Sequence, residues 1–243
     1  MARLPGILFL FVYLAQFLPA ETVLIVQFYN SSNSKSINWI GESLAETLGE
    51  AVAAEGIVRV APDERRTAMA AMGIQPSARL TQATILETAI NVDAGVAVQG
   101  EYEVSREDSA PRRIRITGSV IDIRQMRRVA RLEEAGLLDD LSRIQTRLAW
   151  KLVRALRPGY AMTQEIYLQT HPPVRLDAME NYIRGLLTQN PEQQLRFFST
   201  AARLEPAYAE PNLRLGLSQL ERKDYRAAAN LLAKMGADAT RYR

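Results

Sequence analysis

The sequence predicts an α/β domain with a mixed sheet, which begins as a β-α-β unit and ends in an antiparallel hairpin, followed by an all-α helical-repeat module. Two observations support this. The hydrophobic period of residues 21–158 changes between helix-like and strand-like stretches, whereas residues 175–243 keep the helical period. The composition agrees, since 47% of the 243 residues are hydrophobic and 23% are charged, as in ordinary globular proteins. The chain has no cysteine, which excludes disulfides, thiolate metal sites and lipid attachment through cysteine.

Residues 1–20 have the pattern of a secretory signal peptide. Arg3 is the only charge in this segment, residues 7–18 are apolar, and the small residue Ala20 ends it. An apolar helix of this length spans ~18 Å, which is short of the ~30 Å hydrocarbon core of a bilayer. Leu18 stands where cleavage favours a small residue, so the alternatives are a cleaved signal peptide and an uncleaved N-terminal anchor. Both predict an exported protein, either periplasmic or tethered to the inner membrane through this segment.

The α/β domain is expected to start with a β-α-β unit. The continuous apolar run at residues 22–28 is typical of a strand that is covered on both faces. Residues 39–54 place apolar side chains at helical spacing, which predicts an amphipathic helix, and Gly56 suits its C-terminal end. Residues 57–60 predict a short second strand.

The rest of this domain is predicted from changes of period and from helix-start residues. Pro62 is suited to the first turn of a helix, and Asp139 with Asp140 places acids where the helix dipole favours them. In the third helix of the chain, Ile85, Leu86, Ala89 and Ile90 are expected to face the core. The predicted elements are helices at 62–72 and 81–91, strands at 94–104, 113–120 and 128–133, and a helix at 139–157.

Residues 159–174 are expected to form a linker between two domains. Gly159 follows a proline, and Pro172 and Pro173 are adjacent. After this segment the pattern is helical throughout, with predicted helices at 177–189, 191–204, 208–221 and 225–235. Gly185 and Gly216 hold equivalent places in the first and third of these helices, which indicates an internal repeat of helical pairs.

These helical pairs resemble tetratricopeptide (TPR) repeats. The matching residues are Ala201 and Pro206 in the first repeat, and Tyr208, Ala209, Leu215, Gly216, Asp224, Tyr225, Ala228 and Leu232 in the second. The first repeat is short and the pattern stops after two, although such stacks usually need three or more to bury their faces. The resemblance implies that Glu210, Leu213, Leu217 and Leu220 line an inner groove. These side chains either hold a partner peptide or are covered by the first domain. We favour the second alternative, because a stack of only two repeats needs another part of the protein to pack against.

Residues 21–158 resemble the TolB-like amino-terminal domain of bacterial envelope proteins. The matching residues are Phe28, Asn30, Ser32, the run 39–44, Leu48, Gly100, the run 114–116, Ile121, Asp122 and the helix from Asp139. The turn at 124–126 departs from the pattern, because the family usually has a glycine there. The resemblance implies a mixed α/β domain used for protein contacts, without catalytic residues. It also implies that Trp39 caps the first helix against the sheet, the alternative being an exposed interface anchor.

Basic residues cluster at Arg112, Arg113 and Arg115 and again at Arg124, Arg127, Arg128 and Arg131. A nucleic-acid or anionic-lipid surface is one interpretation. Cross-strand pairing of Arg113 and Arg115 with Glu101 and Glu103 is the other. No aromatic residues are interleaved for base stacking, so we expect paired surface charge and no nucleic-acid partner.

Catalytic, metal and cofactor sites are not predicted. The acidic pairs Asp63-Glu64, Glu133-Glu134 and Asp139-Asp140 are sequence neighbours that mostly diverge, whereas paired-carboxylate hydrolysis needs convergence across a cleft. His171 is the only histidine, too few for a histidine-based zinc site, and we expect it to be exposed. Neither phosphate-binding glycine motif, GxxxxGK[ST] or GxGxxG, occurs.

The sequence therefore predicts a non-enzymatic envelope (periplasmic) scaffold or adaptor, which binds protein partners through the TPR-like repeats. A homo-oligomer is also compatible with the sequence. The alternative is a sensory envelope protein that recognises a small molecule or glycan fragment in the α/β domain.

Overall fold

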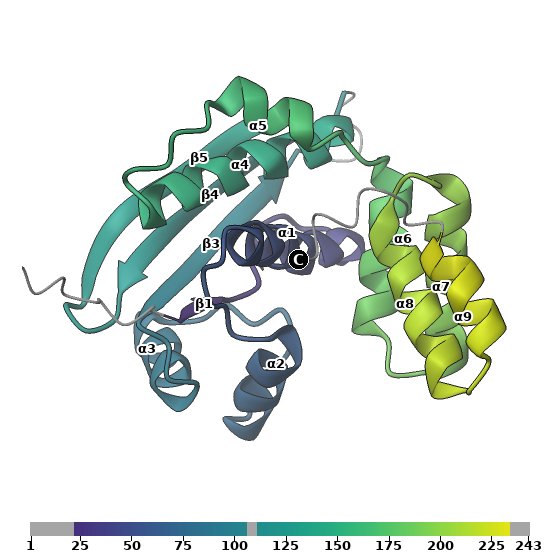
Figure 1. The fold of residues 1–243 in the computed structure, drawn as a ribbon. Coiled ribbons are helices and arrows are strands. Elements are labelled where there is room, and N and C mark those ends of the chain that lie inside the picture. Colours follow the sequence, from purple (N-terminus) through teal and green to yellow (C-terminus); the bar gives the residue numbers. More distant parts are fainter. Residues whose placement is uncertain (1–21, 106–110, 234–243) are drawn as a thin grey trace, which may run out of the picture.

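The computed structural model describes residues 22–105 and 111–233, and the predicted signal segment lies outside these residues. A mixed sheet with the strand order β1-β3-β4-β5 forms the centre of the α/β part (Figure 1). β1 and β2 both pair with β3 in parallel, whereas β3, β4 and β5 pair antiparallel. The strands are β1 (Val23–Ile25), β2 (Tyr29–Asn30), β3 (Val96–Val104), β4 (Arg113–Asp122) and β5 (Arg127–Leu137). The mixed α/β fold is thus confirmed.

Two layers of helices lie against this sheet (Figure 1). α1 (Trp39–Ala54) and α4 (Leu141–Leu156) cover one face and share the main core with it. α3 (Gln82–Asn91), next to α2 (Pro62–Ala71), closes a second, smaller core beside β1 on the other face. Two single-turn 3₁₀ helices, η1 (Lys35–Ile37) and η2 (Leu138–Asp140), precede α1 and α4.

β1 is buried on both faces, as its continuous apolar run predicts. Val23 and Ile25 belong to the main core, and Leu24 and Val26 belong to the second core. The strand expected at 57–60 is not formed. The chain makes only one parallel bridge there, in which the Val23 amide donates to the Val58 carbonyl at 2.9 Å and the Val60 amide donates to the Val23 carbonyl at 3.0 Å. The chain turns away after this bridge because α2 begins at Pro62.

The predicted antiparallel hairpin is confirmed, with Tyr102 opposite Ile116 and Glu103 opposite Arg115. The third strand, β5, is longer than the sequence suggests. The turn before it places Met126 at a φ of 51°, a backbone conformation that favours glycine. The Gln125 amide donates to the Asp122 carboxylate at 2.9 Å and so stabilises this turn without a glycine.

α3 is formed where expected, but its buried face is different. Ile85 and Ala89 are buried as predicted, whereas Ile90 is 64% exposed. Thr88 is fully buried on this face instead. Its hydroxyl donates to the Thr84 carbonyl at 2.8 Å, so it can be buried without a hydrogen bond to water.

The segment expected to be a linker contains a helix, α5 (Gln164–Thr170). Thr163 caps it by accepting from the Ile166 amide at 3.4 Å, and Tyr167 is buried at 2% exposure. The Trp150 indole of α4 donates to the Met162 carbonyl at 2.9 Å. These contacts fix the segment against α4, and its apolar face is too short to be recognised from the hydrophobic period.

Four helices follow, α6 (Leu176–Leu187), α7 (Pro191–Leu204), α8 (Ala209–Glu221) and α9 (Tyr225–Ala233), arranged as two hairpins (Figure 1). A Cβ atom on Gly185 would lie 2.5 Å from Phe198 Cε1, and one on Gly216 would lie 2.7 Å from Leu232 Cδ2. Both glycines therefore allow the next helix to approach closely, which agrees with an internal repeat. Membership of the TPR family stays a prediction, as does the domain boundary at 159–174.

The helical pairs and the α/β part share one core. Tyr182 and Ile183 of α6 and Phe198 of α7 belong to the same buried cluster as Leu48 of α1 and Leu148 of α4. The Arg184 guanidinium also donates to the Ser36 carbonyl at 3.0 Å. α6 is thus fixed against α1.

Candidate functional site

A cavity of about 440 Å³ lies where the helical pairs meet the α/β part. Its walls come from α1, α4 and α5 on one side and from α6 and α8 on the other. Five charged residues line it: Glu46, Glu50, Arg59, Glu210 and Arg214. Glu46 and Glu50 are one turn apart on α1, and Glu210 and Arg214 are one turn apart on α8, so each helix presents two charged side chains on one face.

On the α1 side, Glu46 is almost fully buried at 4% exposure. Arg59 is its partner, with the guanidinium Nη1 3.8 Å from the carboxylate Oε2. A Cβ atom on Gly49 would overlap this guanidinium, so the glycine makes room for Arg59 to lie along α1. The charge of Glu46 is therefore already compensated within the α/β part.

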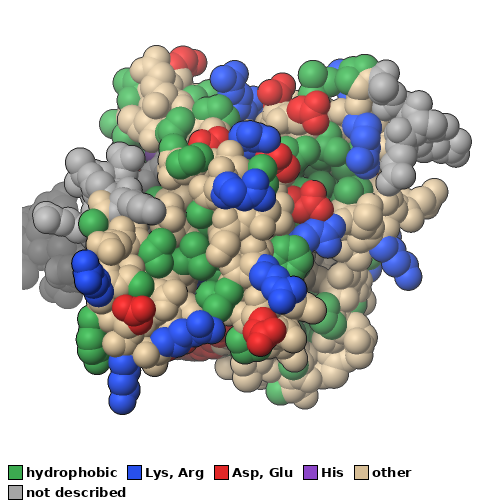
Figure 2. Space-filling model, turned by 90° about the vertical axis from the view of Figure 1, so that its right-hand side faces the viewer, with side chains coloured by type: hydrophobic (Ala, Val, Ile, Leu, Met, Phe, Trp, Pro, Cys, Tyr) green, Lys and Arg blue, Asp and Glu red, His purple; other side chains and the backbone are tan. Residues whose placement is uncertain are grey.

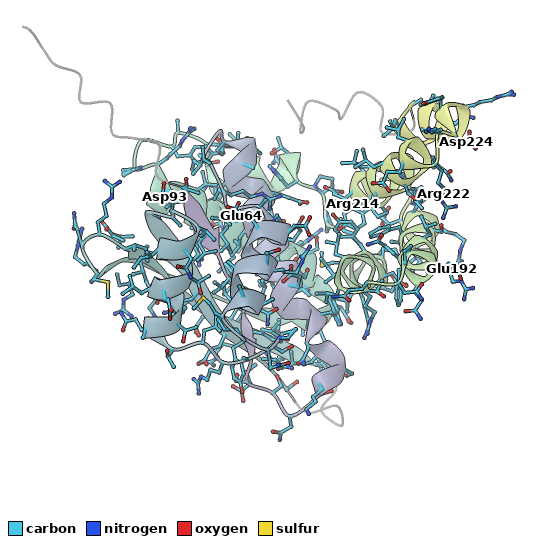
Figure 3. All side chains as sticks on the ribbon, turned by 90° about the horizontal axis from the view of Figure 1, so that it is seen from below. Glu64, Asp93, Glu192, Arg214, Arg222 and Asp224 are labelled. Carbon is cyan, nitrogen blue, oxygen red and sulfur yellow. The ribbon has the colours of Figure 1, made fainter. Side chains whose placement is uncertain are left out.

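On the α8 side, Glu210 is buried at 8% exposure in the first turn of the helix, where the helix dipole favours a carboxylate. Arg214 lies between α8 and the α/β part (Figure 3), where its positive charge interacts with Tyr182, Glu46 and Glu50. The two charged groups of α8 thus point into the junction rather than into solvent.

Glu50 has the most perturbed carboxylate in the cavity. Burial, together with the negative charges of Glu210 and Glu46, raises its pKa well above the usual value. Arg59 and Arg214 lower the pKa but do not compensate. Holding all three carboxylates ionised at once is therefore unfavourable.

Aromatic side chains form another part of the wall. The rings of Tyr182 and Tyr208 meet edge to face with their centroids 5.2 Å apart. Tyr167 stacks on His171 with the ring centroids 4.1 Å apart. Burial, and then the nearby negative charge, raises the pKa of Tyr182 and Tyr208 well above the usual value, which keeps both hydroxyls protonated. Apolar atoms of Met179 complete this side.

A hydrogen-bonded pair joins α1 and α4 beside the cavity. The Gln145 amide donates to the Ser43 hydroxyl at 2.8 Å, and both side chains are buried. Among residues 22–105 and 111–233, no group of three or more His, Asp or Glu side chains is close enough to hold a metal ion.

The four residues predicted to bind partners lie on one face of α8 but in two different environments. Glu210 and Leu213 line the cavity, where Glu210 is buried and Leu213 is half-buried. Leu217 and Leu220 are 41% and 39% exposed. This face of α8 therefore runs from the cavity to the molecular surface.

The cavity residues of α1 were not predicted from the sequence. A signal was present, because Glu42, Glu46 and Glu50 recur every four residues on a largely apolar helix. Glu42 has a structural role, since it forms ion pairs with Arg65 and Arg66. The sequence did not indicate which of these carboxylates faces another part of the chain.

Other residues that the sequence singled out have structural partners. Trp39 is 5% exposed, which confirms a buried role. Glu103 lies opposite Arg115 as expected, but Glu101 lies opposite Thr117 and forms its ion pair with Arg79, at 2.8 Å. The expectation that His171 is simply exposed was wrong, because its ring stacks on Tyr167 and its Nδ1 lies 2.8 Å from the Tyr167 carbonyl.

Two of the acidic pairs that were considered for catalysis contain residues with local ion-pair partners. Asp63 and Glu133 form ion pairs with Arg66 and Arg131. Glu134 forms ion pairs with Arg147 at 2.8 Å and Lys151 at 2.7 Å, both from α4.

No helix in the described part of the chain is both long and apolar enough to cross a membrane.

No protein-family model matches the chain, and no curated protein matches it significantly. Among solved structures, the chain is similar to the C-terminal domain of LpoB from Salmonella enterica, at 18% identity and a TM-score of 0.40 over 49% of this chain and 83% of that one. The lipoprotein GNA1162 from Neisseria meningitidis is similar at 9% identity and a TM-score of 0.40, over 48% of this chain and 80% of that one. The PelC dodecamer from Paraburkholderia phytofirmans is similar at 22% identity and a TM-score of 0.38, over 56% of this chain and 87% of that one.

GNA1162 is named a lipoprotein and PelC a dodecamer, but likeness at this level does not assign a function to the chain. The TolB-like and TPR resemblances are not shown by any of these comparisons and stay predictions.

Proposed function

We propose that the protein is an exported, non-enzymatic adaptor of the cell envelope that binds a protein partner through α8. The observation that carries this proposal is the exposure of Leu217 and Leu220, at 41% and 39%. Single exposed leucines are common on protein surfaces. These two, however, continue the helix face on which the half-buried Leu213 lines the cavity.

The arrangement of the helical pairs supports the same surface. The first pair, α6–α7, has a neighbour because α6 packs on α1. The second pair, α8–α9, has no further helical pair beside it within the described residues. On the side of the molecule that carries these helices, apolar side chains show between charged ones (Figure 2). A partner helix placed against Leu217 and Leu220 would continue the stacking of the pairs. Export rests on the pattern of residues 1–20.

The test places a photo-crosslinking amino acid at position 217 in the organism that makes the protein. We expect a discrete partner to be trapped there and to be lost when Leu220 is changed to Asp. The same crosslinker at Leu187, a leucine 43% exposed at the end of α6, is the matched control and should not trap this partner.

Two results would contradict the proposal. One is equal recovery of the partner from the Leu220→Asp variant. The other is that position 217 crosslinks only to a second copy of the chain, which would identify the surface as the contact of a homo-oligomer instead.

A further inference from the structure

The charges in the junction cavity do not balance. Glu46, Glu50 and Glu210 bring three carboxylates, whereas Arg59 and Arg214 bring two guanidinium groups. An excess of one negative charge in a partly desolvated space is unfavourable unless a positive group compensates it.

The two guanidinium groups are already engaged. Arg59 pairs with Glu46 at 3.8 Å, and the positive charge of Arg214 interacts with Tyr182, Glu46 and Glu50. In contrast, neither Glu50 nor Glu210 makes a hydrogen bond or an ion pair with any residue in the ranges 22–105 and 111–233. Glu210 is also more than nine-tenths buried and lines the cavity. Two carboxylates are thus left for a ligand, and no cationic side chain is left without a partner in the cavity.

The remaining lining suits an organic cation better than a metal ion. The described residues hold no group of three metal-ligating side chains. Tyr182 and Tyr208 present aromatic rings, which attract an ammonium or guanidinium group through the cation–π interaction. Met179 and Leu213 offer apolar contacts for the rest of the molecule. The volume of about 440 Å³ lies within the range of small-molecule pockets.

We propose that this cavity binds a small organic cation, a primary amine or guanidine with an apolar body, whose charged group lies between Glu50 of α1 and Glu210 of α8. Such a ligand contacts both the α/β part and the helical pairs. Recognition of a small molecule was expected within the α/β domain alone, whereas the proposed site needs α8 as well. The proposal does not depend on the adaptor function.

Binding should release a proton. A cation between the two carboxylates favours the ionised form of Glu50, so its pKa falls when the ligand binds. Four charged groups act on Glu50, namely Glu46, Arg59, Glu210 and Arg214. The other titratable groups that line the same cavity are Tyr167, His171, Tyr182 and Tyr208.

The test compares three probes of similar shape and different charge on the full chain: 2-phenylethylamine, 2-phenylethanol and 3-phenylpropanoate. Binding is followed by NMR shifts and by calorimetry in two buffers that differ in ionisation enthalpy. We expect the amine to bind at least about tenfold more tightly than the alcohol, with release of protons, and the carboxylate to bind no better than the alcohol.

The deciding variant is Glu210→Gln, which should weaken amine binding by about tenfold and leave alcohol binding unchanged. Its matched control is Glu192→Gln. Glu192 has the same position in the first turn of α7, but it lies on the outer side of the helical pairs (Figure 3). Glu50→Gln provides a second variant if Glu210→Gln does not fold, and it should abolish the proton release.

The proposal is overturned if the amine and the alcohol bind equally. It is also overturned if no amine binding is detected at roughly 10 mM, or if Glu192→Gln weakens binding as much as Glu210→Gln.

Discussion

At the scale of single residues, Phe28 explains why two distant glycines are needed. A Cβ atom on Gly41 of α1 would overlap the Phe28 carbonyl oxygen, and one on Gly100 of β3 would overlap the Phe28 ring. The Phe28 amide also donates to the Gly41 carbonyl at 3.1 Å. Phe28, Gly41 and Gly100, three of the residues on which the TolB-like resemblance rests, thus form one packing site. Asn30 belongs to the same region, where its amide donates to the Ser34 carbonyl at 2.8 Å.

The change Gly41→Ala should therefore lower the free energy of unfolding by about 1–3 kcal/mol, because the obstacle is backbone and cannot rotate away. Gly159→Ala is the control, since a Cβ atom there would meet nothing within 4 Å, and it should change stability by less than about 0.5 kcal/mol. Urea unfolding of both variants is the measurement. Equal stability of the two would show that α1 and Phe28 do not pack this closely.

At the scale of elements, α2 is attached to the sheet by a buried ion pair. Arg65 of α2 pairs with Glu42 of α1, and its Nη1 donates to the Ile25 carbonyl at 2.8 Å. Both side chains are nearly inaccessible to solvent. One arginine thus joins α2, α1 and the end of β1.

Removing this arginine leaves a buried carboxylate with only the half-exposed Arg66 as partner. We expect Arg65→Ala to lower the free energy of unfolding by about 3–5 kcal/mol. Arg79→Ala, which removes an exposed ion pair with Glu101, should cost less than about 1 kcal/mol. Hydrogen exchange should locate the effect of Arg65→Ala in α2. A loss as small as that of Arg79→Ala would be incompatible with a structural role for the buried pair.

At the scale of the whole molecule, the α/β part and the helical pairs meet around carboxylates that repel one another. Burial and the charges of Glu210 and Glu46 raise the pKa of Glu50 in the folded protein. Between the unfolded and the folded pKa, the native state holds more protons than the unfolded state, so this group makes stability fall as pH rises. The contribution of Glu50 to stability is fully present below its pKa in the unfolded state. It is lost as pH rises through the higher pKa of the folded state.

The change Glu50→Gln should remove this component. We expect the variant to become more stable relative to the wild type as pH rises. The change should begin near pH 4.5, the usual pKa of a glutamate, and end above the raised pKa of Glu50. Urea unfolding at a series of pH values measures this difference, with Glu192→Gln as the control of equal charge change. A difference that is independent of pH would mean that Glu50 titrates normally.

The local pattern of the sequence determined most of the elements. The bounds of α1, the doubly buried β1 and the β3–β4 hairpin follow from hydrophobic period, because it reports which face of one element is buried. The same signal failed for α5, whose apolar face is short, and for Ile90, whose burial depends on what lies opposite α3.

The candidate site depends on how the elements pack. The spacing of Glu42, Glu46 and Glu50 indicates one face of α1, and the TPR resemblance singles out Glu210, but neither pattern indicates that Glu50 and Glu210 share a cavity. Packing of α6 on α1 brings α8 next to the same face of α1, where Glu210 is buried and Glu50 is half-buried. Local patterns along the chain were enough to predict most of the helices and strands. Their assembly decided which charges share a cavity, because burial and electrostatic repulsion arise between elements that are distant in the chain.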